Sequence, residues 1–417
     1  MLFSNRSNGP AIAVLFAAAF AAGAANADSH FEQPLVATAA ELLPANIVKG
    51  PNHSVRSAVH NDGFLYIYDI DTKYGPLRAV STPTLYKRIS ELNAMAGMEQ
   101  LKGTTEFADG LKNQAGNFVK GGVGIVAHPV KSVSGAVSGV ASIFKGVGGT
   151  MHYGKSDTES GRLSVISGFD KTKREYASEF DVDMYSRNKY LQDELTDISR
   201  AGFLGSSIVR LGGAAATGGA GIALTVTGTT QAMKDLLREK SAADLRVINA
   251  DSLTAMGVGS DLVDLFLGNR NFTLTQQTAI VFALKSMSGT TNRAAFIKFA
   301  ALTDNDDMAA FRRRQAEMYA GYSANIAPIA TFESAAQVAV GRNQNNVAIF
   351  CAPLDYILWT QGLSNLAGSL TLGVDGMEGI TGKELWLAGN ASPATAEQMT
   401  KWGWNINERS NAALSAK

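Results

Sequence analysis

The sequence predicts an α+β protein that is predominantly helical, with a small β-hairpin element near the N-terminus and a small mixed α/β element near the C-terminus around a helical body. Three observations predict this class. β-prone runs flank an Asp-Gly pair at 62–63, apolar residues recur at helical spacing through most of 168–325, and strand and helix patterns alternate after residue 337. The 417 residues suffice for about two or three core-sized units.

The charge balance and the single cysteine exclude several classes. Lys+Arg and Asp+Glu both total 37, so the formal net charge is zero. This composition argues against a disordered tail, a collagen-like fibre and a nucleic-acid binder with a large basic excess. Cys351 is the only cysteine, so no disulfide partner exists within the chain, and its apolar neighbours predict a buried, inert thiol.

The first 27 residues have the order of a secretory signal peptide. A short polar start with Arg6 precedes the apolar run 11–25, and Ala25-Asn26-Ala27 fits the small-x-small cleavage pattern. A membrane anchor is the weaker alternative, because the run is short for a bilayer span. We expect cleavage near Ala27 and a periplasmic or secreted mature protein.

Residues 28–105 are predicted to form a β-hairpin followed by a helix. The Asp-Gly pair at 62–63 is a hairpin signal, and a third strand is expected at 77–81. Thr82 is the predicted N-cap of the helix, because Pro83 then occupies the first helical position.

Residues 106–160 form a basic segment rich in Gly, Val and Ser. Within it, 110–156 contains five lysines and no Asp or Glu. Apolar side chains recur there in alternating steps of four and three, which is a helical stripe. The stripe consists of Val119, Val123, Val126, Val130, Val133, Val137, Val140, Phe144 and Val147. The lysines beside it are Lys120, Lys131 and Lys145.

The composition of this segment opposes the helix that its spacing predicts. Glycine, serine and valine are abundant, and Pro129 lies in the middle. Such a helix should form mainly when its stripe meets an apolar surface. That surface is either the protein's own core, where Gly135 and Gly139 would permit close packing, or a membrane surface or another envelope protein.

A weak phosphate-loop match follows the stripe. Its residues are Gly149, Gly154, Lys155 and Ser156. In a true phosphate loop, backbone N–H groups and the lysine hold phosphates. No buried strand precedes the match, and Asp157 and Glu159 follow it, so nucleotide binding is the least favoured hypothesis. We expect no cofactor, and no histidines are spaced as a helical zinc pair.

Residues 161–325 are predicted to be the helical body. Helices are expected at 169–180, 190–198, 242–249, 261–267, 275–287, 293–302 and 306–322. Asp181 and Asp183 resemble the start of a calcium loop, but the later positions do not fit and a turn is expected. Residues 312–314, three arginines, are expected largely on the solvated face. The charge-free stretch 211–233 is predicted as a buried small-residue helix or helical hairpin, with a membrane span as the alternative.

Residues 326–417 are predicted to be mixed. A hairpin is expected from 337–341 and 347–352, and a strand–helix–strand unit from 384–406. Asp355 is interpreted as a structural polar group near a turn.

These observations favour an exported, non-catalytic protein that is envelope-associated or binds a partner through 110–156. The alternative is a periplasmic, hydrolase-like enzyme whose site is assembled from distant residues, since no Gly-x-Ser-x-Gly sequence occurs. Nucleotide binding at 149–156 is the third hypothesis.

Overall fold

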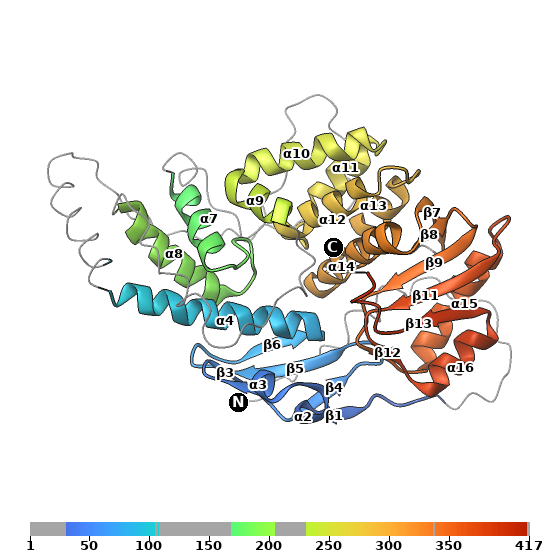
Figure 1. The fold of residues 1–417 in the computed structure, drawn as a ribbon, viewed down its shortest axis with the longest axis horizontal. Helices are drawn as coiled ribbons and strands as arrows, with labels where there is room; N and C mark the ends of the chain where they lie inside the picture. Colours follow the sequence, from blue (N-terminus) through green and yellow to red (C-terminus); the bar gives the residue numbers. More distant parts are fainter. Residues whose placement is uncertain (1–30, 105–106, 108–167, 205–230, 337, 415–417) are drawn as a thin grey trace, which may run out of the picture.

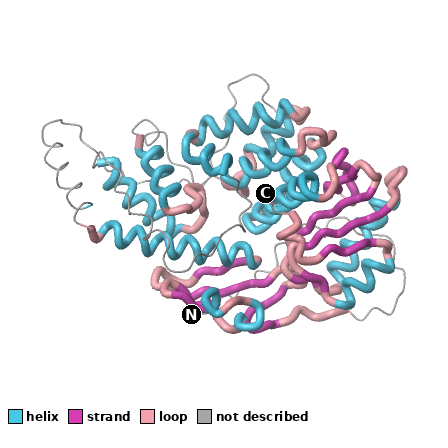
Figure 2. Tube along the Cα trace, in the orientation of Figure 1, coloured by secondary structure: helices cyan, strands magenta, loops and turns pink. Residues whose placement is uncertain are grey.

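The computed structural model describes residues 31–104, 107, 168–204, 231–336 and 338–414. These residues form an N-terminal sheet, a group of helices beside it, a second helical bundle and a C-terminal sheet (Figure 1). Figure 2 shows the strands gathered in two sheets and most of the helices above them. The predicted α+β class with a helical body is confirmed.

The N-terminal sheet is built around one long strand. Its strands are β1 (Val36–Thr38), β2 (Lys49–Gly50), β3 (His53–Val55), β4 (Ala58–Asn61), β5 (Tyr66–Asp71) and β6 (Leu77–Val80). β5 pairs antiparallel with β3, β4 and β6, while β1 pairs with β4 and β2 with β3. The predicted hairpin is confirmed as β4–β5. In its turn, Asp62 accepts hydrogen bonds from the backbone N–H of Phe64 and Leu65, and Gly63 has φ 101°.

The short helices α2 (Ala39–Leu42) and α3 (Ala45–Val48) complete this element, and the long helix α4 (Thr82–Lys102) covers it. The N-cap of α4 is Ser81, whose Oγ accepts from the backbone N–H of Thr84 at 3.3 Å. The prediction that Thr82 is the cap was therefore wrong by one residue. The N–H of Thr82, now the first helical residue, donates to the carboxylate of Asp355, which lies far away in the sequence.

α4 packs against α8 (Lys189–Leu204), α8 packs against α7 (Phe169–Glu179), and α7 packs against α9 (Gln231–Glu239); we call these four helices the helical group. The group shares one apolar core with the N-terminal sheet. Representative core residues are Tyr68, Ile89, Met95, Tyr176, Leu195 and Ile198. The predicted helices at 169–180 and 190–198 are confirmed, the second extending further.

A second bundle contains the helices that the sequence predicted most clearly. They are α10 (Ala242–Ala255), α11 (Ser260–Leu267), α12 (Leu274–Ser286), α13 (Ala294–Ala301) and α14 (Asp306–Asn325). Ser241, Thr273 and Asn305 cap α10, α12 and α14, each accepting from the backbone N–H three residues later. α10 is longer than predicted, because it continues past Asn249.

The C-terminal sheet has the strand order β13-β11-β9-β8-β7. The strands are β7 (Ile329–Ala335), β8 (Val338–Asn343), β9 (Val347–Ala352), β11 (Gly382–Leu387) and β13 (Trp404–Asn407). β7, β8 and β9 are antiparallel, whereas β9, β11 and β13 are parallel. The parallel strands are joined through α15 (Gln361–Asp375) and α16 (Pro393–Lys401), so the predicted hairpin and strand–helix–strand unit are confirmed.

Helices cover both faces of this sheet (Figure 1). On the α13 and α14 side, Phe296, Tyr319 and Phe332 pack edge to face or tilted, with ring centroids 5.1–6.1 Å apart. Cys351 is buried on the sheet as predicted, and burial raises the pKa of its thiol. A short parallel pair, β10 (Tyr356–Ile357) and β12 (Asn390–Ala391), lies toward the N-terminal sheet.

The prediction for the arginines at 312–314 was wrong for Arg312. Arg312 is only 2% exposed; its guanidinium lies 3.2 Å from the ring centroid of Phe299 and donates to Gln315. Aromatic rings can enclose a guanidinium group that stacks on them. The spacing of charges along α14 alone does not reveal such a partner on another helix. Arg313 and Arg314 are partly exposed and pair with Glu317, as the spacing predicts.

Asp355 joins the C-terminal part of the molecule to the N-terminal sheet. Its buried carboxylate accepts hydrogen bonds from the backbone N–H of Tyr66 and of Thr82, both at 3.0 Å. Burial raises the pKa of Asp355 to about 6, and the carboxylate of Asp62 acts in the same direction. The interpretation of Asp355 as a structural group therefore agrees with its contacts.

We expect Asp355→Asn to remove part of the pH dependence of stability. The pKa is about 6 in the folded state against an ordinary 3.8. The folded state therefore binds this proton more tightly, and the associated stability is fully present below pH 3.8 and lost as the pH rises through about 6. The difference between the two pKa values corresponds to about 3 kcal/mol of unfolding free energy.

Urea unfolding of both proteins at several pH values across this range measures the effect. The parent protein should lose more stability than Asp355→Asn as the pH rises, by up to about 3 kcal/mol. Comparing the two proteins cancels the opposite contributions of carboxylates whose pKa is lowered. Parallel stability curves would show that Asp355 does not titrate in this range.

Candidate functional site

The sequence-predicted site residues all lie outside the described residues. The stripe from Val119 to Val147, its lysines and the loop match at 149–156 fall within 108–167. Of the charge-free stretch 211–233, only the last three residues are described, and they begin α9. Among the described residues, no helix is long and apolar enough to cross a membrane.

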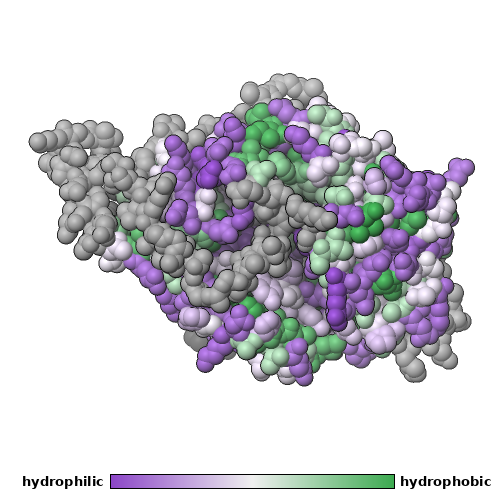
Figure 3. Space-filling view, in the orientation of Figure 1, coloured by the Kyte–Doolittle hydropathy of each residue, from purple (hydrophilic) through white to green (hydrophobic). Residues whose placement is uncertain are grey.

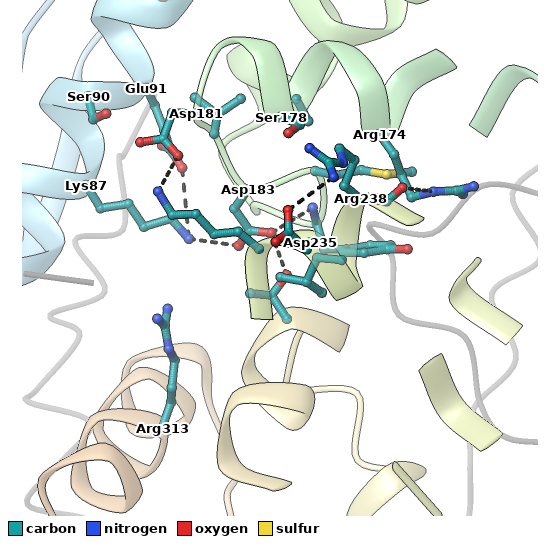
Figure 4. A pocket seen from close by; sticks show the side chains of 17 residues that line it. Lys87, Ser90, Glu91, Arg174, Ser178, Asp181, Asp183, Asp235, Arg238 and Arg313 are labelled. Carbon is teal, nitrogen blue, oxygen red and sulfur yellow. Dashed lines mark hydrogen bonds and ion pairs between the residues drawn. The ribbon is translucent and has the colours of Figure 1, made fainter. Parts of the chain in front are cut away.

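The described part of the chain contains a pocket of about 300 Å³ where the helical group meets the second bundle (Figure 4). α4, α7 and α9 supply most of its wall, and the turn between α7 and α8, α12 and α14 complete it. Basic, acidic, hydroxyl and apolar side chains all line it. The longest run of consecutive residues in the lining is 181–185, so residues that are distant in the sequence assemble the site.

Glu91 is the most deeply buried acid of the pocket. It accepts hydrogen bonds from Arg88 at 2.7 Å, from Asn188 at 2.9 Å and from the hydroxyl of Ser186 at 2.5 Å. Burial alone would raise the pKa of Glu91, but the charges of Arg88 and Lys87 outweigh it and the pKa is lowered. Glu91 is therefore a buried, fully hydrogen-bonded carboxylate.

Asp183 is the second buried acid and comes from the turn between α7 and α8. Lys87 donates to it at 3.1 Å, Thr275 on α12 at 2.6 Å, and the backbone N–H of Tyr185 at 2.9 Å. Its pKa is also lowered, because Lys87 and the hydrogen bonds outweigh the effect of burial. Figure 4 shows Lys87 between the two acids, with Glu91 at 4.0 Å.

Residues 181–187 form a turn between α7 and α8, as the sequence predicts, and donors of the protein occupy the carboxylate of Asp183. The Asp183 carboxylate accepts hydrogen bonds from the ammonium group of Lys87, the hydroxyl of Thr275 and the backbone N–H of Tyr185. These contacts are typical of an acid that stabilises a turn. In the described part of the chain, no group of three or more His, Cys, Asp and Glu side chains could hold a metal ion.

Further ion pairs form the rim of the pocket on the α9 side. Lys234 pairs with Asp181 at 2.7 Å, and Arg238 with Asp235 at 3.1 Å. Arg174 donates from Nε to the backbone carbonyl of Arg238 at 3.1 Å. Acids on the rim thus hold cations in place around the opening.

No family model, no curated protein and no solved structure matches this chain. We therefore infer what the pocket can bind or catalyse from the residues that line it.

Acid–base catalysis needs a group whose pKa lies near the working pH and whose proton can move. Glu91 and Asp183 both have a lowered pKa and are surrounded by donors, so they are ionised and occupied at neutral pH. At this pocket, the arrangement favours binding over proton transfer.

Sequence reasoning missed most of this pocket. Sequence analysis singled out Asp181 and Asp183 as the start of a broken calcium loop, and the arginines at 312–314, of which Arg313 lines the pocket, as a solvated helix face. One further signal was present, because Lys87, Arg88 and Glu91 have i,i+4 and i,i+3 spacing on a helix that otherwise follows an apolar stripe. The contribution of α9 has no sequence signal that we recognise.

Proposed function

We propose that this is an exported, non-catalytic protein that docks on the membrane surface of the cell envelope through residues 110–156. The observation that carries the proposal is the nine-position apolar stripe in a span with five lysines and no acid. Lysines beside an apolar face suit a surface with anionic headgroups. The signal-like sequence at 1–27 supports the location.

The described structure supports a firm attachment for this segment. The chain enters it after α4 and leaves it at α7, and both helices are packed in the helical group. The last residue of α4, Lys102, pairs with Glu194 on α8 at 2.6 Å. The charge-free stretch 211–233 is also joined to this group, because it follows α8 in the sequence and its last three residues begin α9.

Apolar side chains on the rest of the described surface contrast with the continuous stripe predicted in 110–156. Figure 3 shows apolar side chains on the viewed face mixed among polar ones, with a group over α10. Val247 on α10 is 55% exposed and belongs to the second bundle. It therefore provides a matched control for an apolar side chain outside the stripe.

Flotation with vesicles that contain anionic phosphatidylglycerol tests the proposal. The mature parent protein should float with the vesicles, and Val133→Asp with Val137→Asp should reduce binding about a hundredfold or more, since each buried valine contributes about 1.5 kcal/mol. Val247→Asp should float as the parent does. A parent protein that does not float would contradict membrane docking, and retention only by protein-containing envelope fragments would assign the surface to another envelope protein.

A further inference from the structure

Ser81, the residue before α4, has a strained backbone. Its φ is 87° and its ψ is 149°, a combination that proteins use almost only at glycine. A residue with a Cβ atom keeps such a conformation only where the surrounding contacts hold it, and such residues are concentrated at binding sites and switches. The contacts that hold Ser81 therefore indicate what its strain is used for.

Hydrogen bonds on both sides of Ser81 hold this conformation. The N–H of Ser81 donates to the carbonyl of Tyr66 at 2.8 Å, and the N–H of Thr82 donates to the carboxylate of Asp355 at 3.0 Å. The same carboxylate accepts from the N–H of Tyr66 at 3.0 Å. Asp355 thus joins β5 to the first residue of α4, and we call Asp355, Tyr66, Ser81 and Thr82 the clasp.

The clasp lies where two apolar cores of the described residues meet. Phe64 and Leu65, just before β5, belong to the core of the second bundle and the C-terminal sheet, whereas Tyr68 on β5 belongs to the core of the N-terminal sheet and the helical group. Beside the clasp, the N–H of Asp355 donates to the carbonyl of Phe64 at 3.1 Å. Opening of the clasp would therefore separate the segment after β9 from the start of α4.

Three enclosed carboxyls make the clasp sensitive to pH. Burial raises the pKa of Asp62, Asp307 and Asp355, and the charge of Asp62 raises the pKa of the other two further. When the clasp opens, carboxyls that reach water titrate near their ordinary values, so opening releases protons and is favoured as the pH rises. The other charged or titratable groups that act on these carboxyls, or on which Asp355 acts, are Asp306, Arg78, Arg88, Tyr66 and Tyr68.

We propose that the clasp is a strained switch at the start of α4, closed at acidic pH and opening as the pH rises. Release of the Thr82 N–H from Asp355 lets the backbone of Ser81 relax. Lys87, which lines the pocket, lies within about two helical turns of Ser81 on the same helix. The switch consists of described residues, and it does not rest on docking through 110–156.

Hydrogen exchange of the mature protein, expressed as protection factors, tests the pH response. Segments that contain Tyr66 and Thr82 should be less protected than α12. Their protection should fall about twentyfold between about pH 4.5 and about pH 7.5, because the pKa of Asp355 is about 6 against an ordinary 3.8. Protection equal to that of α12, or protection that does not fall as the pH rises, would overturn the proposal.

Two substitutions at Ser81 test the strain. Both Ser81→Gly and Ser81→Ala remove the hydroxyl that accepts from Thr84, but glycine alone adopts this φ without strain. At about pH 7.5, Ser81→Gly should therefore protect the clasp about fivefold better than Ser81→Ala. The same pair at Ser241, an N-cap with φ −70°, measures the ordinary preference for glycine at such a position and should differ less. Equal protection in the two Ser81 variants would contradict a strained switch.

Asp62→Asn tests the contribution of the neighbouring charge. Asparagine keeps the oxygen that accepts from Phe64 and Leu65 and removes the charge that raises the pKa of Asp355. The loss of protection with pH should therefore be smaller than in the parent, whereas Asp264→Asn, at an exposed position of α11, should respond as the parent does. An unchanged response in Asp62→Asn would contradict the role of these carboxyls.

Thermal unfolding checks that each variant folds. If Ser81→Ala does not fold, the comparison of Ser81→Gly with the parent decides, and the clasp of the glycine variant should be the better protected of the two. Weaker protection in Ser81→Gly than in the parent would overturn the proposal.

Discussion

Glu91→Gln is expected to lower the free energy of unfolding by about 3 kcal/mol. Glutamine keeps the size of the side chain and removes the charge that compensates Arg88 and Lys87. It also replaces an oxygen that accepts hydrogen bonds with an NH₂ group that faces donors from Ser186 or Asn188. The side chain of Glu91 is 2% exposed, so water cannot take over these contacts.

Urea unfolding at neutral pH measures the change, with Glu99→Gln as the matched control. Glu99 lies on the same helix and pairs with Lys73 at the surface, where an ion pair contributes about 0–1 kcal/mol. A similar loss in both variants would mean that the buried network around Glu91 does not hold α4 against the turn before α8.

Gly389→Ala is expected to cost about 3 kcal/mol, at the upper end of the effects of overpacking. A Cβ atom at Gly389 would lie 1.8 Å from the backbone oxygen of Asp355. That backbone cannot move easily, because the N–H of Gly389 donates to Leu354 and the N–H of Asn390 donates to Asp355. The substitution should separate the two loops that bring Asp355 to the N-terminal sheet.

Gly289→Ala is the control for this prediction. Nothing lies within 4 Å of the position that its Cβ would take, so its unfolding free energy should change by about 0.5 kcal/mol or less. Thermal or urea unfolding of the two variants gives the comparison. Equal stability would show that the close approach of Gly389 to Asp355 is not maintained in solution.

α4 connects the features on which these predictions rest. Its first turn receives Asp355 from the C-terminal part, its middle supplies Lys87 and Glu91 to the pocket, and its end, at Lys102, leads toward 110–156. The pocket is therefore lined by the same helix that precedes the proposed docking segment.

The helices with strong local signals could be predicted from the sequence. α12 and α14 have apolar spacing and polar caps at Thr273 and Asn305, and local hydrogen bonds fix those ends. The β4–β5 hairpin was equally predictable from Asp62 and Gly63, because a tight turn needs those residue types.

Features that depend on distant residues could not be predicted. The start of α4 depends on such a residue, since Asp355 from the C-terminal part accepts the hydrogen bond of the Thr82 N–H. Arg312 is enclosed because Phe299, on another helix, stacks on it. The pocket shows the same limit, since Lys87 and Asp183 meet across about a hundred residues and no local pattern records their approach.

Hydrogen exchange of the mature protein, measured with and without phosphatidylglycerol vesicles, tests the docking proposal most directly. The account predicts that amides in 110–156 exchange faster than those of α12 in the free protein and become protected when vesicles are added. α12 itself should not change. Protection of 110–156 equal to that of α12 in the free protein would place the stripe in the protein's own core and contradict the account.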